Sequence, residues 1–163
     1  MNESATGGPR KEPGTYALLL RADTAQPIAV GALGEMTVRP GVYVYVGSAF
    51  GPGGVRARVR RHARGDGARH WHVDYLRAAT RLEAAWYTHD PTRRECAWAA
   101  ALRRRPDAEG PLDGFGASDC DCRSHLVALP SPPSLARFRA RLRDEHPDHA
   151  SVGRVEGAAL VGD

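Results

Sequence analysis

Lysine is almost missing from this 163-residue chain, and so are the features that define several classes of protein. Lys11 is the only lysine, so arginine carries nearly all of the positive charge. Three cysteines do not form the spaced framework of a small disulfide-stabilised secreted domain. No apolar run approaches the ~18 residues of a membrane-spanning helix, and the first residues lack the apolar segment of a signal peptide. These absences predict a cytoplasmic protein with no membrane partner.

The composition is otherwise that of an ordinary globular domain, with 42% hydrophobic and 26% charged residues and no internal repeat. The length suits one domain with loose ends. Glycine, proline and polar residues over 1–13 predict a disordered N-terminal tail. The stretch 146–163 has no periodic pattern and predicts a flexible C-terminal tail. Residues 14–145 are therefore the predicted domain.

Short apolar runs and helical periodicities alternate along the domain. "QPIAVGAL" is expected to form a hairpin with the strand before it. In "VYVYV" the valines should face one way and Tyr43 and Tyr45 the other, and three tryptophans, Trp71, Trp86 and Trp98, are expected in the core. The sequence predicts strands over 14–22 and 26–33, a turn at Pro40-Gly41 followed by a strand that ends at Gly47, and strands over 81–89 (with Leu82, Ala84 and Trp86 on one face) and 122–129. It predicts helices from 54, over 69–80, from Asp90 to about Arg104, and over 131–145. This order predicts an α/β or α+β fold with a small, largely antiparallel sheet flanked by helices.

Arginine is concentrated just after the third predicted strand. The formal net charge is only +4, but five arginines fall within nine residues that contain no acid: Arg56, Arg58, Arg60, Arg61 and Arg64. Val55, Val59 and His62 or Ala63 would form the inward stripe of this helix. An arginine run of this kind repels itself, and guanidinium groups suit phosphate. The pattern favours nucleic acid as the partner.

Three short motifs surround this helix. Gly14-Thr15-Tyr16 opens the first strand, and "YVG", ending at Gly47, closes the third. Arg58 and His62 follow with the i, i+4 spacing that places both on one helix face. Further along, "RRECAWAAAL" begins a helix with a single acid, Glu95. Together these motifs resemble the GIY-YIG nuclease superfamily over roughly residues 14–104. With "HWHVDYL" and "GFGASDCDCRSHL", the chain is most similar to an uncharacterised prokaryotic branch of that superfamily, sometimes fused to endonuclease III.

The resemblance implies a GIY-YIG-like core and a phosphodiester hydrolase, and the residue types suit that chemistry. Phosphodiester cleavage needs an activated water, a base for its proton, and positive charge where negative charge accumulates. Glu95 would bind Mg²⁺ or Mn²⁺, both of which prefer oxygen ligands, and Arg58 would hold the scissile phosphate. Tyr45 would orient the water. The base would be Tyr16, which the resemblance favours, or His62, with His70 and His72 as further candidates.

Contacts to the nucleic-acid backbone are expected from the rest of the arginine helix and the segment after it. The predicted nucleic-acid-binding residues are Arg56, Arg60, Arg61, Arg64 and His72. Such contacts position the ligand without reading its sequence. The expected activity is thus a metal-dependent endonuclease acting on DNA, with branched or damaged DNA and repair among its implied uses. A homodimer or a repair-protein partner is also expected.

Two alternatives stay open at this point. A non-catalytic nucleic-acid-binding module of the same fold would keep the arginine helix and have no use for Glu95. Cys120, Cys122 and His125, with Cys96 as a fourth ligand, would suit zinc, but three ligands within six residues differ from the separated pairs of structural zinc sites. The sequence therefore favours magnesium or manganese over zinc.

Two departures from the superfamily pattern stand out. Thr15 replaces the usual isoleucine, and the interval from Tyr16 to Tyr45 is longer than usual. The polar residue that follows the glutamate helix is usually asparagine, whereas this chain has only Asn2. Asp119 or Ser124 is the candidate for that position.

Overall fold

The computed structural model describes residues 8–65, 71–110 and 124–161. None of the helices in these ranges is long and apolar enough to cross a membrane. In chain order the elements are β1 (Gly14–Ala22), β2 (Gln26–Ala29), the 3₁₀ turn η2 (Gly31–Leu33), β3 (Glu35–Val38), β4 (Gly41–Ala49), α1 (Gly54–Arg64), α2 (His72–Arg77), β5 (Arg81–Thr88), α3 (Glu95–Arg103), β6 (Leu126–Leu129), α4 (Leu135–Glu145), β7 (Gly153–Glu156) and α5 (Gly157–Val161).

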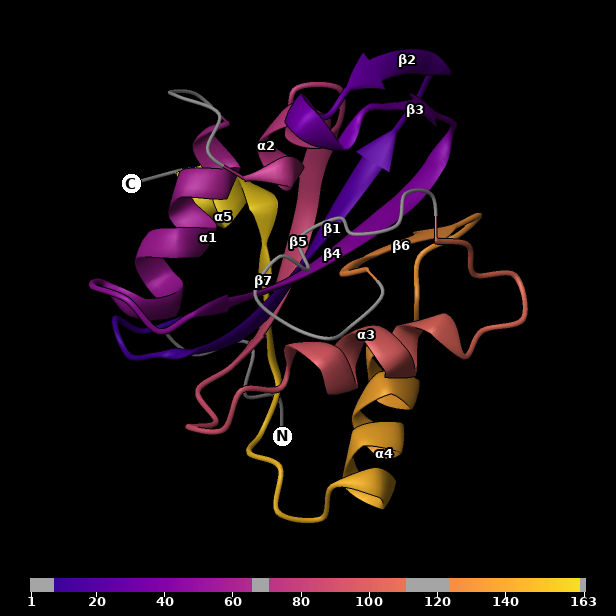
Figure 1. Cartoon of the computed structure of the whole chain (residues 1–163). Coiled ribbons are helices and arrows are strands. Elements are labelled where there is room, and N and C mark those ends of the chain that lie inside the picture. The colour runs from indigo at the N-terminus through magenta and orange to yellow at the C-terminus, as the bar shows by residue number, and fades with distance from the viewer. Residues whose placement is uncertain (1–7, 66–70, 111–123, 162–163) are drawn as a thin grey trace.

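A five-stranded antiparallel sheet forms the centre of the fold, with the strand order β6-β4-β1-β5-β7. Helices α1, α2 and α5 lie on one side of it, and α3 and α4 lie on the other (Figure 1). The predicted α+β class, a largely antiparallel sheet flanked by helices, is confirmed. Both faces of the sheet are covered, so β1 and β4 are buried along nearly their whole length.

The alternation along β4 divides the core into two clusters, as predicted. Tyr43 and Tyr45 pack in the cluster beneath α1, with Val55 and Val59 of that helix. The valines of β4 pack on the other face with Trp86, Trp98 and Phe138. The ring centroids of Trp86 and Phe138 are 4.9 Å apart, and those of Trp98 and Phe138 are 5.1 Å apart. This aromatic contact holds α3 and α4 against the sheet.

The segment before β1 packs against the start of α1 and is not the disordered tail that the composition predicted, at least over residues 8–13. The amide of Val55 donates to the carbonyl of Glu12, and the amide of Arg56 donates to the carbonyl of Arg10, both at 3.0 Å. Gly54 has a φ of 61°, and a Cβ there would lie 2.3 Å from the carbonyl oxygens of Lys11 and Glu12. A side chain at this position would therefore push the segment away from the helix. Residues 1–7 lie outside the described residues.

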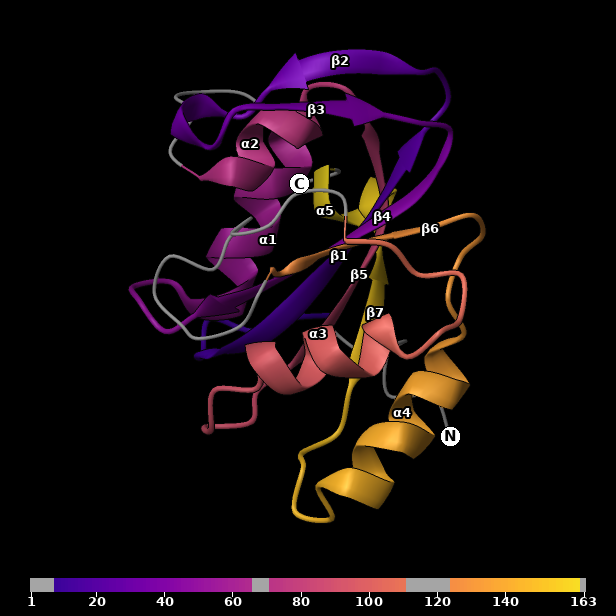
Figure 2. The same cartoon turned by 45° about the vertical axis from the view of Figure 1, so that its right-hand side comes forward.

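The predicted hairpin between the first two strands is wrong. β2 pairs with β3 in a separate two-stranded ribbon, which lies beyond one end of the sheet, next to α2 (Figure 2). β1 is flanked on both sides by β4 and β5, so no edge is left for β2. The added ribbon accounts for the long interval between Tyr16 and Tyr45, while β1 and β4 still pair directly.

Two local predictions around β5 also need correction. The ladder between β1 and β5 shifts register between Leu19 and Leu20, so Leu82 packs in the cluster beneath α1, opposite to Trp86. A bulge of this kind cannot be read from a period-2 pattern. The helix expected from Asp90 begins only at Glu95, because Asp90 accepts from the amide of Thr92 at 2.9 Å and forms a turn before the helix. The helix expected over 69–80 spans His72–Arg77 in the described part of the chain.

The C-terminal segment was predicted to be a flexible tail, but residues 153–161 complete the fold. β7 pairs with β5 at the edge of the sheet, and α5 contacts α1 and β5. Val152 and Leu160 are buried. The amide of Ala150 donates to Asp90 at 2.9 Å, which fixes the chain just before β7. β7 and α5 are too short to show a clear hydrophobic period, so the sequence pattern alone does not predict them.

Candidate active site

The ring of Tyr16 lies over Gly47, its direct partner in the ladder between β1 and β4. A Cβ at position 47 would lie 2.6 Å from both Cζ and Oη of Tyr16. Tyr45, two residues before Gly47, is paired with Leu18 and is therefore the diagonal neighbour of Tyr16 on the same face. The ring centroids of the two tyrosines are 6.4 Å apart. The glycine of the Tyr-x-Gly motif thus provides the space for the tyrosine of the Gly-x-Tyr motif.

His62 of α1 meets this pair of tyrosines from above the sheet. Its Nε2 lies 2.9 Å from Oη of Tyr16, and the two side chains are buried, with Tyr16 1% and His62 2% exposed. Burial lowers the pKa of His62 to about 3, although the charge of Asp74 opposes the change. Burial likewise raises the pKa of Tyr16 to about 12, against the opposing charge of Arg58. Both groups are therefore neutral at pH 7.

Arg58 lies one helical turn before His62 and projects toward the end of β4. Its Nη1 donates to the backbone carbonyl of Ser48 at 3.1 Å, and its guanidinium lies 4.4 Å from the ring centroid of Trp71. The charge of Arg58 lowers the pKa of both tyrosines, although burial keeps each pKa above its ordinary value. In this position, the permanently charged guanidinium of Arg58 could bind a phosphate group held next to the tyrosines.

Trp71 and Asp74, to which the sequence gave no part in the site, hold Arg61 and His62 in place. Arg61 lies 4.2 Å from the Trp71 ring centroid and forms a two-pronged ion pair with Asp74, at 2.9 and 3.1 Å. Asp74 Oδ1 is 3.9 Å from Nδ1 of His62, and its Oδ2 accepts from the amide of Trp71. Trp71 was predicted in the core but is only half-buried. The one sequence signal was an acid in the first turn of α2 within "HWHVDYL".

Glu95 is the first residue of α3, the helix on the side of the sheet opposite to α1 (Figure 1). Burial holds the pKa of Tyr45 well above its ordinary value, and the charge of Glu95 acts in the same direction, so these two side chains lie within electrostatic range. The start of α3 is fixed to β1, because the amide of Arg94 donates to the hydroxyl of Thr15 at 3.2 Å. Thr15, the departure from the usual isoleucine, therefore anchors the helix that carries Glu95.

The surroundings of Glu95 suit a hard divalent cation. Its Oε1 is buried and has no hydrogen-bond partner within residues 8–65, 71–110 and 124–161. An orphaned carboxylate oxygen of this kind is a potential metal ligand. No group of three metal-ligating side chains occurs in the described part of the chain. Mg²⁺ is held in many proteins by one or two carboxylates while water completes its shell, so a single glutamate fits this ion.

The other predicted residues lie away from the centre of the cluster. Arg56, Arg60 and Arg64 are on the less buried sides of α1, and burial lowers the pKa of His72, which is half-buried at the start of α2. Arg61 faces Asp74 and is only partly available to a ligand. His70 lies outside the described residues. The arginine run is thus divided between the site and the outer helix surface.

The polar candidates near β6 have structural partners. Ser124 is buried, and its hydroxyl accepts from the amide of Leu126 at 3.1 Å. The backbone carbonyl of His125 accepts from the amide of Val46. Cys96 is disulfide-bonded, which the sequence did not predict, and a bonded sulfur is no longer a thiolate ligand. Asp119, Cys120 and Cys122 lie outside the described residues. Two of the four ligands of the alternative zinc site thus lie outside the described residues, and that alternative stays a prediction.

A hollow of about 590 Å³ lies between the end of α3 and the start of α4. Its lining includes Leu102, Arg105, Pro132 and Phe138, and none of the residues of the tyrosine cluster borders it. Arg105 fixes one wall, because it donates to Asp107 and to the carbonyl of Ser131. The hollow is thus a separate feature of the molecule.

Comparison with models of protein families gives a match over most of the chain. The model of the family described as "Domain of unknown function DUF123" matches residues 15–146, a range that includes Tyr16, Tyr45, Arg58, His62 and Glu95. No curated protein matches the chain, and neither does any solved structure.

Proposed function

This chain belongs to the family described as Domain of unknown function DUF123, and we propose that it is a metal-dependent endonuclease of the GIY-YIG type that hydrolyses phosphodiester bonds in DNA. One observation carries the proposal. Tyr16, Tyr45, Arg58 and His62 form one contact cluster, and the charge of Glu95 acts on Tyr45 within it. The two tyrosines, the arginine and the histidine that this chemistry needs thus lie together, and the charge of the carboxylate acts on one of them.

The two charged residues, Arg58 and Glu95, would have different roles in the reaction. Arg58 would bind a non-bridging oxygen of the scissile phosphate and stabilise the charge that accumulates there. Glu95 would hold Mg²⁺ or Mn²⁺ through its unpaired Oε1. A bound divalent ion lowers the pKa of a water and neutralises charge on the phosphate. Tyr45, whose ring centroid lies 6.4 Å from that of Tyr16, would orient the attacking water.

Tyr16 and His62 would act in sequence as a proton relay. The pKa of Tyr16, about 12, keeps its hydroxyl protonated, and the pKa of His62, about 3, keeps the imidazole neutral. With the imidazole proton on Nδ1, the nitrogen that faces Asp74, the Tyr16 hydroxyl donates to Nε2. The water would give its proton to Tyr16 Oη while Tyr16 passes its own proton to His62. The two candidate bases then become successive members of one relay.

The outer surface of α1 supports a nucleic-acid substrate. Arg56, Arg60 and Arg64 extend along the helix that carries Arg58, so the backbone on one side of the cut would follow this helix. A domain of this size would recognise specific structures, such as branched or damaged DNA, as a homodimer or with a repair-protein partner. The proposed compartment is the cytoplasm.

Cleavage of plain and branched DNA by the purified protein tests the proposal. We expect Mg²⁺-dependent cutting, and a decrease of at least about 100-fold for Glu95→Gln with DNA binding retained. The matched control is Glu109→Gln, which removes an exposed carboxylate far along the chain from the cluster and should leave the rate unchanged. Binding without any cutting by the wild-type protein would instead support a non-catalytic nucleic-acid-binding module.

A further inference from the structure

Arg93, two residues before Glu95, is exposed and contacts Ser48 and Phe50 at the end of β4, and these three residues form a rim there. Its guanidinium lies 4.5 Å from the ring centroid of Phe50, and its Nη1 donates to the hydroxyl of Ser48 at 3.2 Å. Phe50 follows β4 directly and is half-buried. These contacts hold a long, charged side chain in one orientation on the surface.

Ser48 joins this rim to the proposed catalytic arginine. Arg58 binds the backbone carbonyl of Ser48, and Arg93 binds its hydroxyl. The two guanidinium groups therefore contact the same residue from different elements, α1 and the segment before α3. An anion bound to Arg58 would have a second positive charge close by, on the Glu95 side of the cluster.

Arg93 differs from its neighbour Arg94 in how its charge is used. Arg94 is buried and forms an ion pair with Asp90 at 3.1 Å, so it serves the fold. Arg93 is exposed, and no carboxylate pairs with it within the described ranges. Its contacts are a neutral ring and a neutral hydroxyl, which orient the guanidinium without cancelling its charge.

A planar cation beside an aromatic ring has the two properties that bind a nucleotide. Guanidinium groups hold phosphate through paired hydrogen bonds, and aromatic rings stack on unpaired bases. Stacking needs a base that is not already paired in a duplex. The chemistry of the rim therefore points to an unpaired nucleotide.

We propose that Arg93 and Phe50 form a nucleotide subsite for the unpaired residue next to the scissile phosphate, with Arg93 on its phosphate and Phe50 under its base. The subsite rests on the proposed endonuclease function. It explains how a small domain would select DNA with an unpaired nucleotide at the cut. Ser48 is the positioning residue that links the subsite to Arg58.

Binding of two single strands of equal charge tests the subsite. The probes are a 12-residue oligothymidylate and a 12-residue strand of abasic sugar phosphates, and affinity is measured by fluorescence anisotropy in the cleavage-deficient Glu95→Gln protein. We expect the thymidylate to bind about 5-fold or more tightly than the abasic strand, as one stacked base provides. Phe50→Leu should reduce this ratio toward one, and Phe50→Tyr should preserve it.

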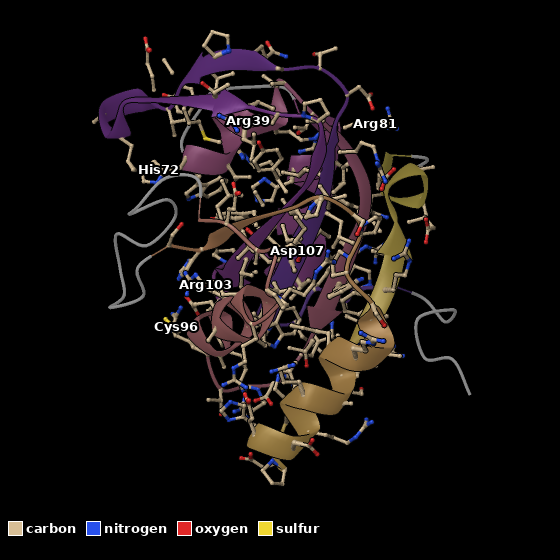
Figure 3. The ribbon with its side chains drawn as sticks, turned by 90° about the vertical axis from the view of Figure 1, so that its right-hand side faces the viewer. Arg39, His72, Arg81, Cys96, Arg103 and Asp107 are labelled. Atoms are coloured by element: carbon tan, nitrogen blue, oxygen red, sulfur yellow. The ribbon has the colours of Figure 1, made fainter. Side chains whose placement is uncertain are left out.

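Arg93→Gln should weaken binding of both strands by a similar factor and make binding less dependent on salt, by about 0.7 in the slope of log affinity against log salt. Arg39→Gln is the matched control, because Arg39 is exposed by β3, well away from Cys96 at the start of α3 (Figure 3). An unchanged base preference in Phe50→Leu, or equal effects of the two arginine variants, would overturn the subsite. Failure of the wild-type protein to cut DNA would count against the endonuclease alone, because these measurements need no catalysis.

Discussion

Tyr16 and Gly47 face each other across β1 and β4, and the tyrosine ring occupies the space that a side chain at position 47 would need. The two short motifs at these positions are therefore one structural unit. The same arrangement recurs at the far edge of the sheet, where Tyr87 of β5 lies over Gly153 of β7. Only the first of these two pairs contacts His62.

Gly47→Ala should therefore separate packing from activity. Its Cβ would lie 2.6 Å from Oη of Tyr16 and would displace the hydroxyl from His62. We expect a loss of about 1–3 kcal/mol of stability from overpacking and a decrease in cleavage rate of about 100-fold or more. Gly153→Ala produces the same clash with Tyr87, at 2.7 Å from Cζ, and should cost similar stability with little change in rate. Equal losses of activity in both variants would contradict the assignment.

Tyr16→Phe and His62→Gln test whether the two side chains act as one relay. Each single substitution should lower the cleavage rate by about 10²–10⁴-fold, the range for removal of a general acid–base group. The double variant should lose little more than either single one, because residues that act as a unit are not additive. Single-turnover rates of all four proteins at saturating DNA give the comparison. Multiplicative losses would mean that the two groups act independently.

Acid should destabilise the protein through His62. Its pKa lies near 3 in the folded protein and near 6.5 when unfolded, so below pH 6.5 the unfolded chain binds a proton that the folded chain does not. The free energy of unfolding should thus fall as pH falls from about 6.5 toward 3, by up to about 1.4 kcal/mol per pH unit from this group. Urea unfolding at pH 7.5, 6.0 and 5.0 should show a shallower decline for His62→Gln than for the wild type.

The C-terminal elements should be required for stability. Leu160 of α5 is buried in the cluster beneath α1, and Leu160→Ala should lower the free energy of unfolding by about 2–5 kcal/mol. Ala158→Ser, on an exposed position of the same helix, should change it by less than about 0.5 kcal/mol. Thermal and urea unfolding of both variants provide the measurement. A neutral effect of Leu160→Ala would mean that the segment does not pack as described.

Local sequence patterns gave correct predictions for features that depend on a single strand or helix. The alternation of valines and tyrosines assigned the two faces of β4 correctly, and the i, i+4 spacing placed Arg58 and His62 on one side of α1. The errors arose where distant segments compete for the same partner. β5, not β2, pairs with β1 at the edge that the predicted hairpin would have used. β7 pairs with the outer edge of β5, and no local pattern in the sequence indicates this strand.

The candidate site shows the same division. Tyr16, Tyr45, Arg58, His62 and Glu95 were all named from short motifs, whereas Trp71, Asp74 and Arg93 were not. These three act through contacts with residues 12 to 45 positions away in the chain. A single sequence carries no record of which acid meets which base, because long-range ion pairs depend on the final positions of whole elements.

The sequence by itself determined the type of most elements before residue 146, the two faces of β4 and the short motifs that carry the reactive side chains, because these follow from local patterns such as periods of two and 3.6 residues. Only the tertiary structure decided that the ring of Tyr16 fits over Gly47, that Asp74 lies behind His62 and that β7 closes the sheet. Those outcomes depend on the register and packing of segments far apart in the chain, which are settled when the whole core closes at once.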